Sequence, residues 1–236
     1  MLNAYHNNFC DNLLPMNTEM NFDQARHNMI EQQIRTWEVL DQRVLDLLDE
    51  LHREDFVPVT YRNLALADIQ IPLSHGQVTM TPKVEARLLQ VLDIQKSDNV
   101  LEVGTGCAYL TALLARASSR VVSVDIFEEF PRQAAEKLSR HRINNVILEH
   151  GDAINGWDKQ KNFDVIVLTG SLPVLPSCFQ QQLSPMGRLF VITGSLPVME
   201  AELITRVGKN EWRRESLFET FIPPLMGANL TDTFDF

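Results

Sequence analysis

The residues best placed to do chemistry follow a short apolar run, where the chain reads Glu102-Val103-Gly104-Thr105-Gly106. Glycines at the end of a strand let a ligand approach the backbone closely, and a helix beginning near Ala108 would point its amide groups at that ligand. A nicotinamide or flavin fingerprint, GxGxxG, needs a third glycine at position 109, which is Tyr109 here. The spacing therefore disfavours a dinucleotide.

Three carboxylates extend this candidate site. Glu102 would oppose a pyrophosphate, but it suits a cationic ligand that carries an ammonium or sulfonium group. Asp125 closes the next apolar run about 20 residues later, where a carboxylate can accept from both hydroxyls of a ribose. Asp152 follows the third run and is placed to accept from an adenine amino group. Together the three predict S-adenosylmethionine as the cofactor.

Each of these residues also has a purely structural interpretation. Asp152 would serve as a helix cap, and Glu102 would be a surface carboxylate at a strand end. Because the residues occur together, in order and at the expected spacing, we favour the cofactor site. The residues that we predict to bind the cofactor are Glu102, Gly104, Thr105, Gly106, Asp125, Ile126, Gly151, Asp152, Ala153 and Thr169.

The elements that must position these residues alternate between two periods. Short β-branched runs occur at 100–103, 121–124, 146–148, 165–168 and 189–192, and helical stretches separate the first three. This alternation predicts an α/β fold with a doubly wound parallel sheet, which binds ligands at the carboxyl ends of its strands. Residues 201–207 and 212–221, on either side of Gly208-Lys209-Asn210, predict an antiparallel hairpin that ends the sheet.

Upstream of the sheet we predict an N-terminal helical cap. Amphipathic patterns begin at Asn21 and Asp41, and residues 56–72, with two prolines, predict an extended connection over the surface. Thr81-Pro82 predicts a helix start in which the Thr81 hydroxyl caps the first turn. The expected organisation is a flexible tail (1–20), a helical cap with an active-site loop (21–80) and a cofactor-binding domain (81–236).

Composition excludes several classes of protein. The net charge of −10, from 21 Lys and Arg against 31 Asp and Glu, would repel a nucleic-acid backbone. Apolar runs are too short for a membrane span, and no secretory pattern opens the chain, so we expect a cytoplasmic protein without nucleic-acid or membrane partners. The three cysteines, Cys10, Cys107 and Cys178, lack the spacing of a metal site, so no metal is expected.

Several further motifs resemble the protein-L-isoaspartate O-methyltransferases. They are Gly104-Thr105-Gly106, Gly151-Asp152-Ala153, the run from Phe163 to Thr169, Pro185-Met186-Gly187-Arg188-Leu189, and upstream Met29 to Arg35, Arg53 to Pro58, Pro72-Leu73 and His75-Gly76-Gln77. The resemblance covers nearly everything after residue 20. It implies a Rossmann-like sheet of seven strands, an N-terminal segment over the active site, S-adenosylmethionine as methyl donor, and a protein or peptide carboxylate as acceptor.

One loop departs from the family pattern. The family loop usually runs Gly-x-Thr-Ile-Ser-x-Pro, whereas this chain reads Gly76-Gln77-Val78-Thr79-Met80-Thr81-Pro82 at unchanged spacing. Val78 and Met80 therefore replace both usual hydroxyls. The candidate catalytic residues are Met80, at the serine position, its neighbours Thr79 and Thr81, and His75.

Two alternatives to isoaspartyl methylation follow from this departure. One is a methyltransferase of the same fold with a different, unidentified small acceptor, and the other is a protein that binds S-adenosylmethionine without turnover. A smaller departure is Cys107-Ala108, where the family often has Ser-Gly. Cys107 is either a reactive thiol at a helix start or a small packing residue.

Overall fold

The computed structural model describes residues 20–160 and 162–228. Cys10 and the predicted tail, apart from its last residue, lie outside these ranges. Among the described residues, no helix combines the length and the apolar character needed to cross a bilayer.

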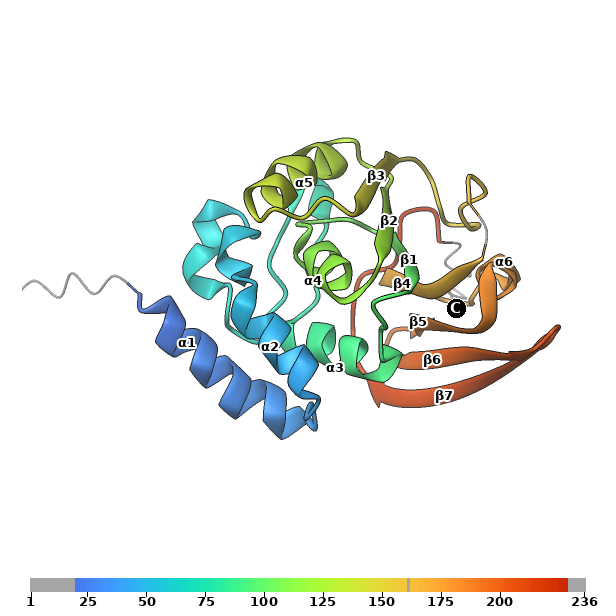
Figure 1. The fold of residues 1–236 in the computed structure, drawn as a ribbon, viewed down its shortest axis with the longest axis horizontal. Coiled ribbons are helices and arrows are strands. Elements are labelled where there is room, and N and C mark those ends of the chain that lie inside the picture. Colours follow the sequence, from blue (N-terminus) through green and yellow to red (C-terminus); the bar gives the residue numbers. More distant parts are fainter. Residues whose placement is uncertain (1–19, 161, 229–236) are drawn as a thin grey trace, which may run out of the picture.

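A seven-stranded sheet forms the centre of the molecule, with the strand order β3-β2-β1-β4-β5-β6-β7 (Figure 1). The first five strands are parallel, and β6 and β7 run antiparallel to their neighbours. The strands are β1 (Asn99–Val103), β2 (Arg120–Asp125), β3 (Val146–His150), β4 (Phe163–Leu172), β5 (Leu183–Ser195), β6 (Val198–Gly208) and β7 (Glu211–Glu219). The predicted parallel sheet and its terminal hairpin, β6–β7, are confirmed.

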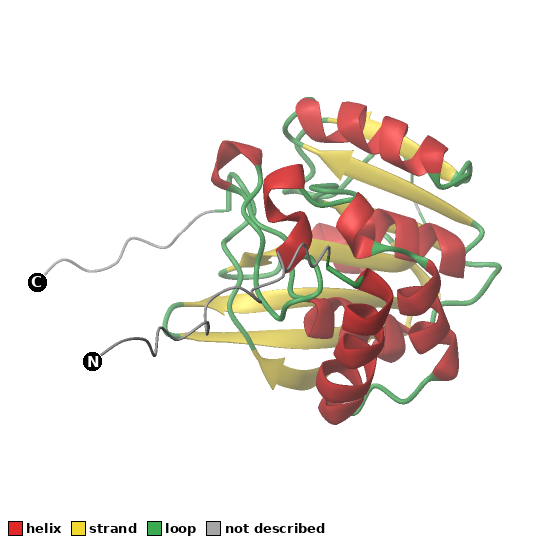
Figure 2. Ribbon diagram, turned by 90° about the vertical axis from the view of Figure 1, so that its left-hand side faces the viewer, coloured by secondary structure: helices red, strands yellow, loops and turns green. Residues whose placement is uncertain are grey.

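Helices cover the two faces of the sheet unequally (Figures 1 and 2). The helices after the cap are α3 (Pro82–Leu92), α4 (Tyr109–Ala117), α5 (Glu129–Arg140) and the short α6 (Ser177–Gln181). Apolar side chains of α3, α4, α5 and the cap share one core with one face of the sheet. The other face packs against α6 and irregular segments, through residues such as Phe179 and Trp157.

The N-terminal cap packs on α3 and α4. Its helices are α1 (Phe22–Met29) and α2 (Gln42–Glu50), which begin where the amphipathic patterns predicted. Asn21 and Asp41 cap them, each accepting from a backbone N–H of the first turn. Short 3-10 and π-helical elements fill the connections, namely η1 (Ile30–Ile34), η2 (Arg35–Trp37), η3 (Arg53–Asp55), η4 (Val59–Leu64) and η5 (Ser74–Gly76). Apolar residues of the cap and of α3–α5 form one continuous core.

Two sequence predictions in this region are wrong. Residues 56–72 are not an extended surface connection, because they include the 3-10 helix η4 and bury Phe56 and Ile71 completely. Thr81 does precede α3, but its side chain makes no capping hydrogen bond. Pro82, which lacks an N–H and has a fixed φ, starts the helix without that hydroxyl.

Candidate active site

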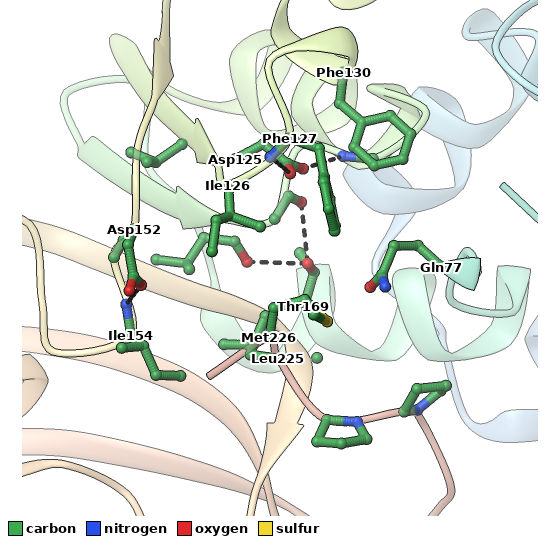
Figure 3. Close-up of a pocket in the computed structure, with 18 of the residues that line it drawn as sticks. Gln77, Asp125, Ile126, Phe127, Phe130, Asp152, Ile154, Thr169, Leu225 and Met226 are labelled. Carbon is green, nitrogen blue, oxygen red and sulfur yellow. Dashed lines mark hydrogen bonds between the residues drawn. The ribbon is translucent and has the colours of Figure 1, made fainter. Parts of the chain in front are cut away.

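A pocket opens at the carboxyl ends of β1, β2 and β4, where parallel sheets of this kind bind ligands (Figure 3). Its walls come from the glycine loop after β1, the end of β2, residues 151–154 and the segment 222–226. Eight predicted cofactor residues line it: Gly104, Gly106, Asp125, Ile126, Gly151, Asp152, Ala153 and Thr169. The fold thus brings together residues that are up to 65 positions apart in the chain.

The glycine loop leaves no room for a side chain at its first position. Gly104 has φ +101°, and a Cβ there would lie 2.0 Å from Thr169 Oγ1. The Thr169 hydroxyl instead lies 2.9 Å from the carbonyl oxygen of Val103 and 3.0 Å from that of Gly104, to which it donates (Figure 3). Thr169 therefore fixes the loop that forms the pocket floor, in addition to lining the pocket.

Asp125 is held rigidly at the end of β2. Its Oδ2 accepts from the N–H of Gly106 and its Oδ1 from the N–H of Phe127, each at 3.0 Å. Burial raises the pKa of Asp125, and these backbone hydrogen bonds act in the opposite direction. Carboxylate oxygens can accept more than one hydrogen bond, so both oxygens keep capacity for a ligand.

Asp152 lies on the opposite side of the pocket and is exposed. Its Oδ1 accepts from the N–H of Ile154 at 2.9 Å, which closes a tight turn (Figure 3). No helix begins at this turn, so the interpretation of Asp152 as a helix cap is wrong. The turn aligns the carboxylate without occupying all of its acceptor sites.

Glu102 and Thr105 do not line this pocket. Glu102 is fully buried, and its Oε2 accepts from the hydroxyls of Thr111 and Ser123, each at 2.6 Å. Burial raises the pKa of Glu102 to about 8. The interpretation of Glu102 as a surface carboxylate is therefore wrong. Thr105 lies 2.7 Å from Ser123 through its hydroxyl and belongs to the same buried group.

Beneath the pocket lies a second hollow, which we call the inner cavity. It measures about 40 Å³ and shares Leu73, Val78, Gly104, Gly106 and Thr169 with the pocket. Its remaining lining residues are Thr79, Met80, Glu85, Glu102, Thr105, Cys107, Tyr109 and Leu110. The two hollows therefore adjoin each other at these five shared residues.

Comparison with known proteins identifies the family. The family model for protein-L-isoaspartate (D-aspartate) O-methyltransferase matches residues 24–224. The chain is 34% identical over 217 residues to protein-L-isoaspartate O-methyltransferase 2 of Pelobacter propionicus, covering 91% of this chain and 96% of that protein. It is 39% identical over 156 residues to the Myxococcus xanthus enzyme, covering 66% and 74%. The chain belongs to the protein-L-isoaspartate O-methyltransferase family.

A solved structure shows the same fold. A Plasmodium falciparum protein described as a member of this family, in complex with S-adenosyl-L-homocysteine, superposes with a TM-score of 0.72 at 19% identity. The match covers 88% of this chain and 99% of that one. The predicted Rossmann-like methyltransferase fold is thereby confirmed.

Arg53 holds the loop 76–82, which differs from the usual family pattern, through hydrogen bonds to Thr79 and Met80. The Arg53 guanidinium is fully buried, and its Nη2 donates to Thr79 Oγ1 at 3.0 Å and to the carbonyl of Met80 at 2.7 Å. Thr79 Oγ1 also accepts from the N–H of Ile71 at 3.0 Å. The Thr79 hydroxyl oxygen therefore accepts from two scaffold groups, which fix its position in the wall of the inner cavity.

Met80 lies in the wall of the inner cavity and belongs to the main apolar core, with 5% of its surface exposed. Thr81 does not line the pocket or the inner cavity, and its buried hydroxyl has no hydrogen-bond partner among the described residues. Of the candidate catalytic residues, Met80 and Thr79 are the two that line the inner cavity.

His75 is at the rim and serves to hold the loop. Its Nε2 lies 3.1 Å from Glu129 Oε2, and its ring stacks on Phe127 with centroids 4.2 Å apart. The φ of +58° at His75 makes the sharp turn that returns the chain toward Gln77 and Val78, which line the pocket. These contacts give His75 a structural role at the pocket edge.

Several residues that line the pocket were not predicted from the sequence. Phe127, Phe130, Leu225 and Met226 border the pocket, together with Pro223 and Pro224 (Figure 3). Among the described residues upstream of β1, the pocket is lined only by Leu73, Gln77 and Val78, and the cap helices α1 and α2 contribute no lining residue. The prolines of segment 222–226 were the one available signal, since they mark a fixed, non-helical chain.

Other sites are not supported by the geometry. Burial raises the pKa of the Cys107 thiol, which favours the packing interpretation over a reactive thiolate. Within the described ranges, no group of three or more His, Cys, Asp or Glu could hold a metal ion. A larger hollow of about 350 Å³ lies between α2 and the turn 93–96, at the amino ends of the strands and away from every candidate residue.

Proposed function

We propose that this chain transfers a methyl group from S-adenosylmethionine to the free carboxylate of an isoaspartyl residue in a protein or peptide. The observation that carries the proposal is the pocket at the carboxyl ends of β1, β2 and β4, in a chain of the protein-L-isoaspartate O-methyltransferase family. The related Plasmodium falciparum structure binds the demethylated product, S-adenosyl-L-homocysteine.

The residues present fit this cofactor. Gly104 lines the pocket with backbone atoms alone, because a Cβ there would lie 2.0 Å from Thr169 Oγ1. Asp125 would hold the ribose hydroxyls, Asp152 the adenine amino group, and Ile126 and Ala153 would pack against the base. When bound, S-adenosylmethionine supplies an electrophilic methyl group on a sulfonium centre.

The chain's own contribution to the reaction is positioning and exclusion of water. A carboxylate is already ionised near neutral pH, so its methylation requires no strong general base. The apolar side chains of Leu73, Val78 and Ile222 line the pocket beside Gly104. They would exclude water from the sulfonium of the cofactor and the carboxylate of the acceptor, whose opposite charges are partly neutralised in the transition state. Arg53 holds the loop that carries Val78, which keeps this part of the pocket wall in place.

The test is methyl transfer from labelled S-adenosylmethionine to an isoaspartyl peptide, with the same peptide carrying ordinary aspartate as control. We expect label on the isoaspartyl peptide only. Equal labelling of both peptides, or of neither, contradicts the proposed acceptor. If S-adenosylhomocysteine nevertheless binds in calorimetry, the cofactor assignment is retained and a different acceptor must be sought.

A further inference from the structure

Several buried polar side chains line the inner cavity. Glu85, Glu102 and Tyr109 all line it, and each side chain belongs to a residue that is at most 2% exposed. Glu102 Oε1 and the Tyr109 hydroxyl are buried and have no hydrogen-bond partner among the described residues. Because buried polar atoms are almost always paired in proteins, these two atoms indicate a missing partner.

The charges around the cavity are not balanced. Within the described part of the chain, Arg53 is the only cation that forms an ion pair with either carboxyl, through Nε to Glu85 Oε2 at 3.1 Å. The same guanidinium also donates to the carbonyl of Ala65 at 2.6 Å and to the loop at Thr79 and Met80. Glu85 therefore shares its cation with three other acceptors, and Glu102 forms no ion pair among the described residues.

The ionisation of both carboxyls reflects this imbalance. Burial raises the pKa of Glu85 to about 7 and that of Glu102 to about 8, and the negative charge of Glu85 raises the pKa of Glu102 further. A second positive charge in the cavity would stabilise the ionised form. A second negative charge would be repelled.

The position and the volume of the cavity limit which positively charged group can enter it. The cavity adjoins the pocket at Gly104, Gly106 and Thr169, so a group attached to a ligand in the pocket can enter it. Its volume of about 40 Å³ is enough for a small polar group, since one water needs ~10–15 Å³. The methionyl end of the proposed cofactor carries an ammonium and a carboxylate, of which only the ammonium matches these walls.

We propose that the inner cavity receives the α-ammonium group of S-adenosylmethionine, and that Glu85 makes binding depend on that group. The inference rests on the proposed function. In this arrangement the ammonium donates to Glu85, to Glu102 Oε1 and to the oxygen of Tyr109. Glu85 is thus a specificity-determining residue, one helical turn beyond the loop that departs from the family pattern.

The experiment measures binding by calorimetry for two ligands. One is S-adenosylhomocysteine, and the other is its analogue lacking only the α-amino group. We expect the wild type to bind the analogue at least ~10-fold more weakly, the loss typical of one hydrogen-bonded charge. Glu85→Gln should weaken binding of S-adenosylhomocysteine about 10-fold and leave the analogue unchanged, because the Gln amide oxygen still accepts from Arg53.

Two further variants complete the design. Glu136→Gln removes an equal charge from an exposed position on α5 and should change neither affinity. Tyr109→Phe removes a hydroxyl without a protein partner, so it should keep the fold and weaken S-adenosylhomocysteine severalfold more than the analogue. This variant and the wild-type comparison decide the matter even if Glu85→Gln fails to fold.

Equal affinity of the wild type for both ligands overturns the inference while leaving the proposed function intact. An equal loss for both ligands in Glu85→Gln and in Tyr109→Phe also overturns it, because it shows that these residues act only on the structure. If the wild type fails to bind S-adenosylhomocysteine at all, the proposed function itself is wrong, and the inference falls with it.

Discussion

Asp125 combines a structural and a proposed binding role, and a substitution can separate them. Its carboxylate holds the Gly106 N–H and lines the pocket. We predict that Asp125→Ala weakens S-adenosylhomocysteine binding by ~1–3 kcal/mol, the range for losing a charged hydrogen-bond partner. Calorimetry measures this loss, and Asp158→Ala, an exposed aspartate outside the pocket, is the control. An affinity that Asp125→Ala leaves unchanged would remove the ribose role.

Met80 occupies the position where the family usually has serine. Replacing it with serine should lower the stability of the fold and raise the rate of methyl transfer. Met80→Ser deletes a buried side chain from the core and should destabilise the fold by ~2–4 kcal/mol. It also places a hydroxyl in the wall of the inner cavity, and we expect isoaspartyl methylation to become ~10-fold faster or more. Met80→Ala, measured for melting temperature and rate, isolates the packing effect. Equal rates for the serine and alanine variants would show that the hydroxyl is irrelevant.

At the scale of elements, the loop 78–80 depends on a contact from the N-terminal cap. Arg53 contacts Glu85, Ala65, Thr79 and Met80 through a planar fork that lysine cannot reproduce. We predict that Arg53→Lys lowers the free energy of unfolding by ~2–4 kcal/mol and also weakens S-adenosylhomocysteine binding. Urea unfolding and calorimetry measure the two effects, with the exposed Arg62→Lys as control. Normal ligand affinity in Arg53→Lys would mean that the loop keeps its course without the clamp.

The strands were predictable because burial dictates their composition. Val165 to Leu168, for example, are fully buried and form an unbroken β-branched and apolar run, as expected of a central parallel strand. Residues 56–72 could not be predicted in this way, because 3-10 turns rest on short-range hydrogen bonds and have no apolar period. The prolines there signalled a break in regular structure but not the burial of Phe56 and Ile71.

The candidate site was predictable only where local sequence determines the geometry. Asp125 ends a strand, Gly104 and Asp152 follow strands, and the parallel sheet brings strand ends together. The segment 222–226 reaches the site through long-range backbone contacts, with the Ser171 N–H donating to the Pro223 carbonyl and the Leu225 N–H to that of Ser171. No local pattern specifies such a return. The position of Glu102 likewise follows from the side of β1 that it faces, which the glycine motif does not specify.

The whole molecule should become less stable as pH rises through neutrality. Burial raises the pKa of Glu85 to about 7 and of Glu102 to about 8, against 4.5 for an ordinary glutamate. The folded protein therefore keeps protons that the unfolded chain has released. Their stabilising effect is complete below about pH 4.5 and is lost as pH rises through the folded pKa values. Burial lowers the pKa of His141, which works in the opposite direction near pH 6.

We therefore predict a larger free energy of unfolding at about pH 5.5 than at about pH 8, with a slope of up to ~1.4 kcal/mol per pH unit for each proton retained. Urea unfolding across this range measures it. Glu102→Gln, which cannot titrate but still accepts from Thr111 and Ser123, should flatten the dependence, because it removes the higher of the two raised pKa values. A stability that rises between about pH 5.5 and pH 8, or a slope that Glu102→Gln leaves unchanged, would mean that the buried carboxyls ionise as they do in water and that some other cation balances them.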